Sequence, residues 1–312
     1  MLSEFALSPA IFRTASYESS AVADLCLRSL GPPLLEDCIV RNLHGGDWLR
    51  VIQEQRDSLH PKAKELIKKL EKQGRLVNHE AMVATCPACE VEWENETFSS
   101  HEQSALAGMI FTRESKAIRH SGESLVACPE TLSTSDFWKD RSCSRRIPRS
   151  IDAYCKLLEP LLRHANWIAY MDPHLDPSER RYHDFIELLT HPHLTARHSK
   201  PNMEVHRVAW LGDGRDKSPR KADIEEKFRK EWSARLEHSG ITLKVFLWPD
   251  FHDRFLASNL LGLNWSNGFD TTTDTNARVT VGRLSRGDSD DLQLEFSENS
   301  KRHGTPLGFT IG

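Results

Sequence analysis

Residues 241–270 read ITLKVFLWPDFHDRFLASNLLGLNWSNGFD, and this stretch decides the fold of the second half of the chain. Its first eight residues, 241–248, are rich in β-branched and aromatic side chains, which is typical of a largely buried strand. Pro249 ends that strand because proline cannot donate a hydrogen bond to a ladder. Residues 262–270 form a further extended piece, in which Asn267-Gly268 suits a tight turn.

His252 and Arg254 lie two residues apart between these two pieces. In an extended segment this spacing places both side chains on one face, with the neighbouring Phe251, Asp253 and Phe255 on the other. A neutral imidazole can attack phosphorus or move a proton, and a guanidinium can hold a phosphate through two hydrogen bonds. The pair therefore indicates phosphate chemistry.

The same stretch resembles the second half of a phospholipase D-like domain. That family carries His, any residue, Lys, four further residues and Asp, followed by a strand with Gly, Ser or Thr, and often Asn. Here the matching positions hold His252, Arg254 in place of Lys, Asn259 in place of Asp, and then Gly262, Asn264 and Ser266. The chain is more similar to a divergent branch with an HDR sequence, which includes the C-terminal domain of MIT-domain proteins. The resemblance covers roughly residues 150–312.

The resemblance implies phosphodiester cleavage through a covalent phosphohistidine, without a catalytic cofactor or metal. His252 would be the nucleophile, Arg254 would grip the phosphate, and Asn264 and Ser266 would donate hydrogen bonds to it. Asp270 would orient His252 or Arg254. The family draws two histidines from two motifs, so this single motif implies either a homodimer or His174 as the second histidine.

His174 is a candidate because it lies at the carboxyl end of an apolar strand expected at residues 166–175, and ligands gather at such strand ends in open α/β sheets. His183 and His206 are secondary candidates. Helices and strands are expected to alternate along this half of the chain, which predicts an α/β sandwich with a mixed sheet. The expected elements are a helix capped by Ser150 (151–165), the strand 166–175, a helix (181–193), a strand (202–212) and a long helix (221–240).

The pattern of the first half predicts a mainly α-helical domain at residues 1–145. An arginine-rich boundary at 139–150 joins it to the phospholipase D-like domain at residues 150–312. Residues 1–16 show no period and are interpreted as a loosely attached arm. Four helices and a short strand are expected, because serines that can cap a helix, Pro61 in a first turn and glycines at helix ends mark their bounds. These are helices at 21–30 (ending at Gly31-Pro32-Pro33), 34–43, 60–74 and 102–111, and a strand near 124–129, with a further helix starting at Asp47.

Cys86 and Cys89 have the spacing of half a tetrahedral zinc site. The sequence holds no second pair at this spacing, so the alternative is two ordinary core cysteines. The seven cysteines, an odd number in a long chain, indicate reduced thiols rather than a disulfide framework. Ligands that would complete a structural zinc site are His79, His101, His120, Cys128 and Cys143.

Composition sets the remaining bounds. With 312 residues, 38% hydrophobic and 28% charged, the chain is expected to be soluble and cytoplasmic. It has no apolar run of membrane-spanning length and no basic secretory start. A net charge of −4 argues against indiscriminate coating of nucleic acid, while allowing a local basic groove.

Three functions follow from these observations. The first is a phospholipase D-like nuclease acting on nucleic acid; by analogy with related modules, it would belong to a prokaryotic antiviral defence system. The second is a catalytically degenerate module that binds nucleic acid, phospholipid head groups or a protein partner within a larger complex, because Lys has become Arg and Asp has become Asn. The third is a zinc-stapled scaffold subunit, which rests on Cys86 and Cys89.

Overall fold

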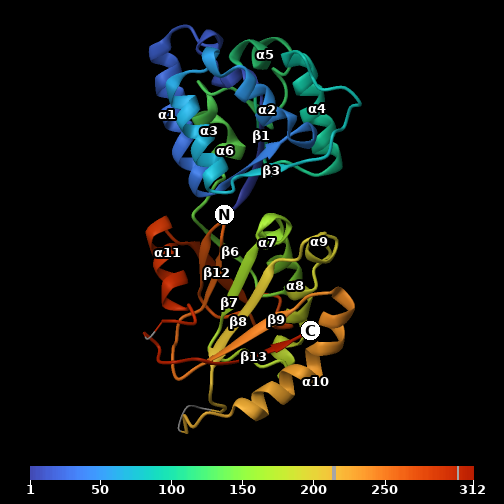
Figure 1. The fold of residues 1–312 in the computed structure, drawn as a ribbon, viewed down its shortest axis with the longest axis vertical. Helices are drawn as coiled ribbons and strands as arrows, with labels where there is room; N and C mark the ends of the chain where they lie inside the picture. The colour runs from blue at the N-terminus through green and yellow to red at the C-terminus, as the bar shows by residue number, and fades with distance from the viewer. Residues whose placement is uncertain (213–215, 301) are drawn as a thin grey trace. The chain divides into compact units, whose positions relative to one another are not determined.

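The chain divides into two compact units, residues 2–142 and residues 143–312. The structure is a computed structural model that describes residues 1–212, 216–300 and 302–312, and Figure 1 traces its elements. The division falls between Ser142 and Cys143, within the arginine-rich segment 139–150. Along the described ranges, no helix is both long and apolar enough to cross a membrane.

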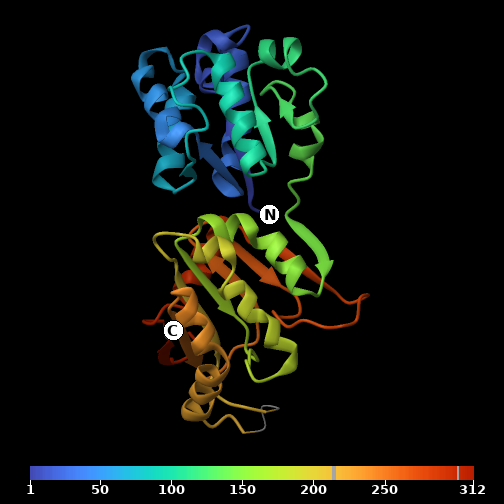
Figure 2. The same cartoon turned by 90° about the vertical axis from the view of Figure 1, so that its right-hand side faces the viewer.

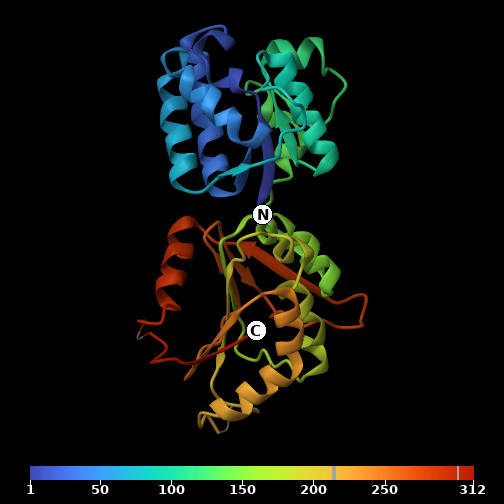
Figure 3. The ribbon, with the colours of Figure 1, turned by 45° about the vertical axis from the view of Figure 1, so that its right-hand side comes forward.

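A parallel sheet of five strands, in the order β3-β2-β1-β4-β5, forms the centre of the first unit. Figure 3 shows α1 and α3 on one side of these strands and α4 on the other. The strands are β1 (Ser3–Leu7), β2 (Cys38–Asn42), β3 (Leu76–Asn78), β4 (Gly108–Ile110) and β5 (Val126–Ala127). The helices are α1 (Ser20–Glu36), α2 (Asp47–Glu54), α3 (Pro61–Lys72), α4 (Glu90–Gln103), α5 (Arg113–Ile118) and α6 (Asp136–Lys139), with 3₁₀ turns at Pro9–Phe12, Thr14–Ser16, His44–Gly46, Arg56–Ser58 and Leu132–Thr134.

Two expectations for this unit were wrong. Residues 1–16 are not a loose arm, because β1 is the central strand and its Phe5, Ala6 and Leu7 are fully buried. Residues 5–7 show no alternation because a strand buried on both faces is continuously apolar. The unit is rich in helix, as expected, but its helices are organised around a sheet that the sequence analysis did not predict.

The expected break at Gly31-Pro32-Pro33 is also absent. Helix α1 continues through both prolines to Glu36, and residues 38–42, expected to be helical, form β2. Two prolines remove two backbone donors, but Leu30 and Leu34 on either side of them are both buried, so packing holds the helix together. Residues 108–110, expected within a helix, form β4 for the same reason as β1: they are buried and pair with it.

A mixed sheet of eight strands forms the second unit, in the order β13-β9-β8-β7-β10-β11-β12-β6. Strands β7, β8 and β9 are parallel, and the remaining pairs are antiparallel. The fold is therefore α/β with a mixed sheet, as the sequence predicted. The strands are β6 (Ser144–Pro148), β7 (Trp167–Met171), β8 (Asn202–Val208), β9 (Leu243–Trp248), β10 (Phe255–Ser258), β11 (Gly262–Trp265), β12 (Arg278–Arg283) and β13 (Leu307–Ile311).

Helices cover both faces of this sheet, as Figure 3 shows, with α11 on one face and α7, α8 and α10 on the other. Leu292 and Phe296 on and after α11 pack into an apolar cluster with Met171 and Trp248. The C-terminus lies beside α10 in Figures 1 and 2. The helices are α7 (Ile151–His164), α8 (Ile186–Leu189), α9 (Pro192–Thr195), α10 (Lys221–Ser239) and α11 (Arg286–Glu295), with a 3₁₀ helix at Arg180–Phe185.

Two details of the second unit differ from the expectation. The helix expected at 181–193 is broken into a 3₁₀ turn and two short helices, because Pro192 starts a new helix whose cap is the His191 side chain. The arginine-rich boundary at 139–150 is also part of the fold, since residues 144–148 pair with β12 as an edge strand.

Candidate functional site

The carboxyl ends of β7, β8 and β9 meet at one edge of the mixed sheet, since the three strands are parallel. Strand β10 begins at the same edge, because Phe255 pairs with Met171 at the end of β7. This register places Arg254 next to the segment that begins at Asp172. Open α/β sheets bind ligands outside such strand ends. We call the group formed here by Asp172, His174, Trp210, His252 and Arg254 the strand-end site.

Asp172 is the fully buried anchor of this site. Its Oδ1 accepts a hydrogen bond from the backbone N–H of His174 at 3.1 Å. Its Oδ2 accepts from the Tyr182 hydroxyl at 3.1 Å and from the backbone N–H of Phe269 at 3.0 Å. The carboxylate thus fixes the loop that carries His174. Asp172 was not among the residues predicted from the sequence, although an acidic residue closing an apolar strand was the available signal.

His174 is a half-buried imidazole among positive charges. Its ring meets that of Trp210 edge to face, with centroids 5.7 Å apart. Burial lowers the pKa of His174, the Asp172 carboxylate opposes this, and the guanidinium groups of Arg254, Arg181 and Arg207 lower it further. The imidazole is therefore neutral at pH 7, a form that can accept a proton or attack an electrophile.

Two hydrogen-bond donors at this edge have no partner among the described residues. They are Nε of Arg254 and Nε1 of Trp210, and both atoms are buried. Another guanidinium nitrogen of Arg254 donates to the backbone carbonyl of His252 at 2.9 Å. Neither an indole nor a guanidinium can accept a hydrogen bond, so a ligand that satisfies these atoms must present acceptors. The acceptor Oδ1 of Asp250 is also buried without a partner, while its Oδ2 lies 2.5 Å from Nζ of Lys217.

His252 lies in the connection before β10 rather than in an extended strand. Its side chain is exposed, and the described residues supply it with no hydrogen-bond or ion-pair partner. The expected common face with Arg254 is therefore replaced by a contact from the Arg254 side chain to the His252 backbone. The imidazole is accessible to a ligand, and no carboxylate orients it.

Asp270 does not orient His252 or Arg254, contrary to the sequence analysis. Arg149 donates two hydrogen bonds to its carboxylate, and a nitrogen of Arg181 lies 3.9 Å from it. This pairing raises the pKa of Arg149. Asp270 is thus the anchor of an arginine pair, which the sequence could not show because Arg149 lies 121 positions away.

The other residues named by the resemblance are spread over the sheet. Asn264 is exposed on β11. The Ser266 hydroxyl accepts a hydrogen bond from the backbone N–H of Thr280 at 3.0 Å. Asn259, at the position of the family's Asp, follows β10 at the opposite edge and accepts from the backbone N–H of Asn166 and Trp167. Its role is to cap the start of β7, so it takes no part in the strand-end site.

Two further arginines near His174 were not found by the sequence analysis. Arg207 is buried, and its guanidinium donates to the carbonyl groups of Leu175 and Trp210 at 2.7 and 3.2 Å. Arg181 faces a polar groove of about 480 Å³. Spacing gave no signal for either, because each lies on a different segment from His252. The groove is lined by Arg180, Arg181, His183, Asp184, Thr271, Thr272 and Thr273.

His206 lies in the sheet interior rather than at the strand-end site. It is fully buried, its Nδ1 accepts from the indole of Trp248 at 3.0 Å, and its Nε2 lies 3.3 Å from Glu204. Burial lowers the pKa of His206 despite Glu204. Its stacking on Phe246 and Trp248 gives it a packing role.

Cys86 and Cys89 do not share a ligand cluster in the described part of the chain. Cys86 lies instead with His44 and Asp47, with one donor atom of each residue within 4.8 Å of the others, while Cys89 is exposed at the cap position of α4. Most of the proposed completing ligands have partners elsewhere. His101 accepts from Leu106, His120 bonds Glu94, His79 bonds Glu80, and Cys128 bonds Thr131, whereas Cys143 is exposed in the second unit.

Hydrogen bonds within the group of His44, Asp47 and Cys86, together with Arg50, shift the pKa values of Asp47 and His44. The hydrogen bond from Arg50, with another from His44, lowers the pKa of Asp47 to about 2. Burial disfavours the imidazolium of His44, but the hydrogen bonds to Asp47 and to the Val83 carbonyl, with the charges of Glu96 and Asp47, together outweigh burial and raise the pKa of His44. His44 and Asp47 were not among the residues predicted from the sequence, because residues 34–43 before them were expected to be helical and strand β2 was not foreseen.

Comparisons with known proteins complete the description. No family model matches the chain, and no curated protein matches it. Among solved structures, the chain is similar to a polyphosphate kinase from Porphyromonas gingivalis, at 16% identity over 50% of this chain and 26% of that one, with a TM-score of 0.33. It is also similar to TrmBL2, an archaeal chromatin protein with a novel mode of DNA binding, at 13% identity over 78% and 81% of the two chains, with a TM-score of 0.30. The match spans about a quarter of the kinase, and TM-scores this low carry no argument about function.

Proposed function

We propose that the second unit is a phospholipase D-like domain that binds and hydrolyses phosphodiesters of nucleic acid at the strand-end site. The observation that carries the proposal is the setting of His174, a neutral imidazole placed among the guanidinium groups of Arg254, Arg181 and Arg207. A phosphodiester supplies what this edge lacks, namely acceptor oxygens for unpartnered donors and negative charge for the cations.

The proposed reaction has two steps. A neutral nitrogen of His252 attacks phosphorus, the bond from phosphorus to the leaving oxygen breaks, and that oxygen takes a proton from His174. Water then attacks the phosphohistidine, gives its proton to His174, and releases His252 as the phosphorus–nitrogen bond breaks. Arg254 balances the charge on the phosphoryl oxygens in both transition states.

The protonation of His174 follows from ligand charge. In the free protein its pKa is lowered by burial and by the nearby arginines. A bound phosphodiester carries negative charge, which favours the imidazolium form and raises this pKa. His174 can therefore become an acid in the complex and return to being a base after the leaving group departs. Because His252 and His174 belong to the same chain, this mechanism needs no residue from a second copy.

The groove beside Arg181 favours a nucleic-acid backbone as the ligand. It is lined over about 480 Å³ by two arginines, a histidine, three threonines and one aspartate, and Arg181 both lines it and acts electrostatically on His174. A polymer that places one phosphate at the strand-end site can therefore place a neighbouring phosphate in the groove. A net charge of −4 confines this attraction to the local surface.

Nuclease assays test the proposal directly. Purified protein is incubated with labelled single- and double-stranded DNA and RNA in the presence of EDTA, and His252→Ala and His174→Ala are compared with His238→Ala. His238 is an exposed histidine on α10, so its variant should cleave like the wild type. Loss of cleavage in both test variants is the expected result. Cleavage that persists in His252→Ala, or that EDTA abolishes, would contradict the mechanism.

A binding module is the second candidate, and one observation favours it. The described residues provide no carboxylate to orient His252, and the matched Lys and Asp positions hold Arg254 and Asn259. If fluorescence anisotropy shows that the protein binds oligonucleotides and the nuclease assay shows no cleavage, the protein is this binding module. Cleavage that rises with the square of enzyme concentration would instead assign the second histidine to another copy of the chain.

A further inference from the structure

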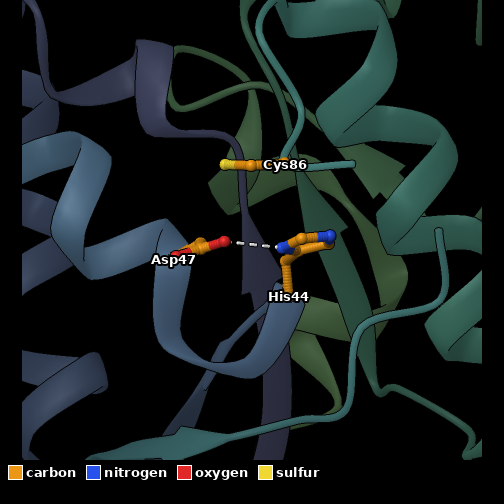
Figure 4. Close-up of side chains that lie close together, drawn as sticks. All are labelled: His44, Asp47 and Cys86. Carbon is orange, nitrogen blue, oxygen red and sulfur yellow. Dashed lines mark hydrogen bonds and ion pairs between the residues drawn. The ribbon is translucent and has the colours of Figure 1, made fainter. Parts of the chain in front are cut away.

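We propose that His44, Asp47 and Cys86 of the first unit form a binding site for a divalent transition-metal ion, with Zn²⁺ as the ion that matches the donor set. One donor atom from each residue lies within 4.8 Å of the others. Figure 4 shows His44 and Asp47 facing each other and Cys86 close to them on a separate segment; His44 lies in the turn after β2, Asp47 begins α2, and Cys86 precedes α4. Imidazole, carboxylate and thiolate are the three protein ligands of zinc.

The hydrogen bonds of His44 leave one nitrogen for a metal. Its Nε2 lies 3.0 Å from the carbonyl oxygen of Val83, and a carbonyl only accepts, so this nitrogen carries the hydrogen. Its Nδ1 lies 2.7 Å from Oδ2 of Asp47. Two lone pairs cannot face each other at this distance without a positive centre between them. That centre is either a proton, giving an imidazolium, or a metal ion. An Nε2–H bonded to a backbone carbonyl is the usual support of a metal-bound histidine.

The distances are compatible with coordination after a small adjustment. Zinc bonds of about 2.0–2.1 Å to nitrogen and oxygen and about 2.3 Å to sulfur place tetrahedral donors roughly 3.3–3.6 Å apart. The pair of His44 and Asp47 would therefore open by about 0.6 Å, and the donor atoms of all three residues already lie within 4.8 Å of one another. Rotation of an Asp47 or Cys86 side chain is enough for this adjustment, since neither is fully buried.

The backbone around His44 is held in a strained form. His44 has a φ of 52°, and in the described ranges it is the one residue other than glycine with a positive φ. Gly45 and Gly46 continue the left-handed turn at φ of 66° and 112°, and Gly46 packs against the side-chain amides of Asn42 and Asn78. Strain of this kind concentrates where a side chain is aimed at a ligand. The turn also follows the carboxyl end of β2, where parallel sheets present ligand sites.

Arg50 supports the cluster from outside. Its Nε donates to Oδ1 of Asp47 at 2.9 Å, which leaves Oδ2 for the ion, and its Nη2 lies 3.5 Å from the Cys86 sulfur. A cysteine nucleophile would need an imidazole nitrogen free to take the thiol proton. Nε2 of His44 carries its hydrogen towards the Val83 carbonyl, and Nδ1 faces Oδ2 of Asp47 rather than the sulfur, so the geometry fits a ligand set. Three protein ligands leave a fourth position for water or for a substrate.

Cobalt spectroscopy of the full chain tests the site. The protein is dialysed against EDTA, returned to metal-free buffer, and titrated with Co²⁺, whose thiolate charge-transfer and visible absorption bands report coordination by sulfur. Zn²⁺ is then added to displace it. One equivalent of Co²⁺ per chain is expected, with bands lost on Zn²⁺ addition. Cys86→Ser, His44→Ala and Asp47→Asn should each weaken binding by ~10-fold or more, since even outer partners of ligands matter that much.

Cys89→Ser is the matched control, because Cys89 is on the same segment and outside the cluster. It should leave the bands and the stoichiometry unchanged. Loss of the bands in Cys89→Ser, unchanged binding in His44→Ala, or a folded wild type that gives no bands would each overturn the proposal. Far-UV circular dichroism checks that each variant is folded. If His44→Ala does not fold, Asp47→Asn still tests the site, because it keeps the volume of the side chain. These readings do not depend on activity in the second unit.

Discussion

Asp172 accepts a hydrogen bond through Oδ2 from the backbone N–H of Phe269 at 3.0 Å, and this bond ties the end of β7 to the turn after β11. The two residues lie 97 positions apart. The same carboxylate holds the backbone of His174 through Oδ1. One buried side chain therefore sets both the position of the candidate acid–base histidine and the path of the turn behind it.

Replacing Asp172 by Ala should destabilise the protein strongly. The change leaves three donors without an acceptor, from His174, Tyr182 and Phe269, and each such loss costs about 1–3 kcal/mol. We expect the free energy of unfolding to fall by about 3 kcal/mol or more, measured by urea denaturation. Asp253→Ala, at an exposed site, should stay within about 0.5 kcal/mol of the wild type. Equal effects of the two changes would contradict this role for Asp172.

Gly268→Ala should also be costly. Gly268 has a φ of +87°, and an added Cβ would lie 2.6 Å from Oδ2 of Asp172, so both the backbone and the carboxylate would have to move. We expect a loss of about 1 kcal/mol or more in unfolding free energy. Gly287→Ala on α11 meets nothing closer than 3.9 Å and should be neutral or stabilising. Thermal melting of the two variants side by side provides the comparison, and a stable Gly268→Ala would show that the turn is not constrained as described.

His174 should titrate below the ordinary histidine value of 6.5, because burial disfavours its charged form and the arginines add to that effect. The unfolded chain then takes up this proton at a higher pH than the folded chain. Between the two pKa values the unfolded state binds more protons, so folding stability falls as the pH falls through that window. NMR of the imidazole Cε1–H, assigned with His174→Gln, measures the midpoint. Adding inorganic phosphate should raise it, and a midpoint at or above 6.5 without phosphate would contradict the proposed setting.

Arg254 separates an enzyme from a binding module. In an enzyme, Arg254→Ala should lower turnover far more than it weakens oligonucleotide binding, because only stabilisation specific to the transition state accelerates the reaction. Arg254→Lys restores the family's residue and should keep part of the activity, since Lys provides a point charge without the two-pronged donor. In a binding module, Arg254→Ala should weaken affinity by about 1.5–3 kcal/mol. Turnover and affinity reduced by the same factor would contradict a transition-state role for Arg254, and a wild type without turnover would be a binding module.

Local patterns determined several elements before any tertiary contact was known. The buried strand at 241–248 was correctly placed because a run of β-branched and aromatic residues ending at Pro249 has few alternatives. The helix α7 was correctly placed by its amphipathic pattern after Ser150, and α10 by its stop at Gly240. His252, Arg254 and His174 were selected because of their residue types and their places after apolar strands.

Only the tertiary structure decided which of these residues work together. It placed Arg254 near His174 through the antiparallel pairing of β10 with β7, assigned Asp270 to Arg149, and moved Cys86 from Cys89 to His44 and Asp47. In the first unit it made the patternless start of the chain the central strand β1. The sequence by itself determines periodicity, caps and breaks, because these depend on neighbours along the chain. Strand pairing and the partners of a charged side chain depend on residues tens of positions away, and their free energies are settled only when the chain packs.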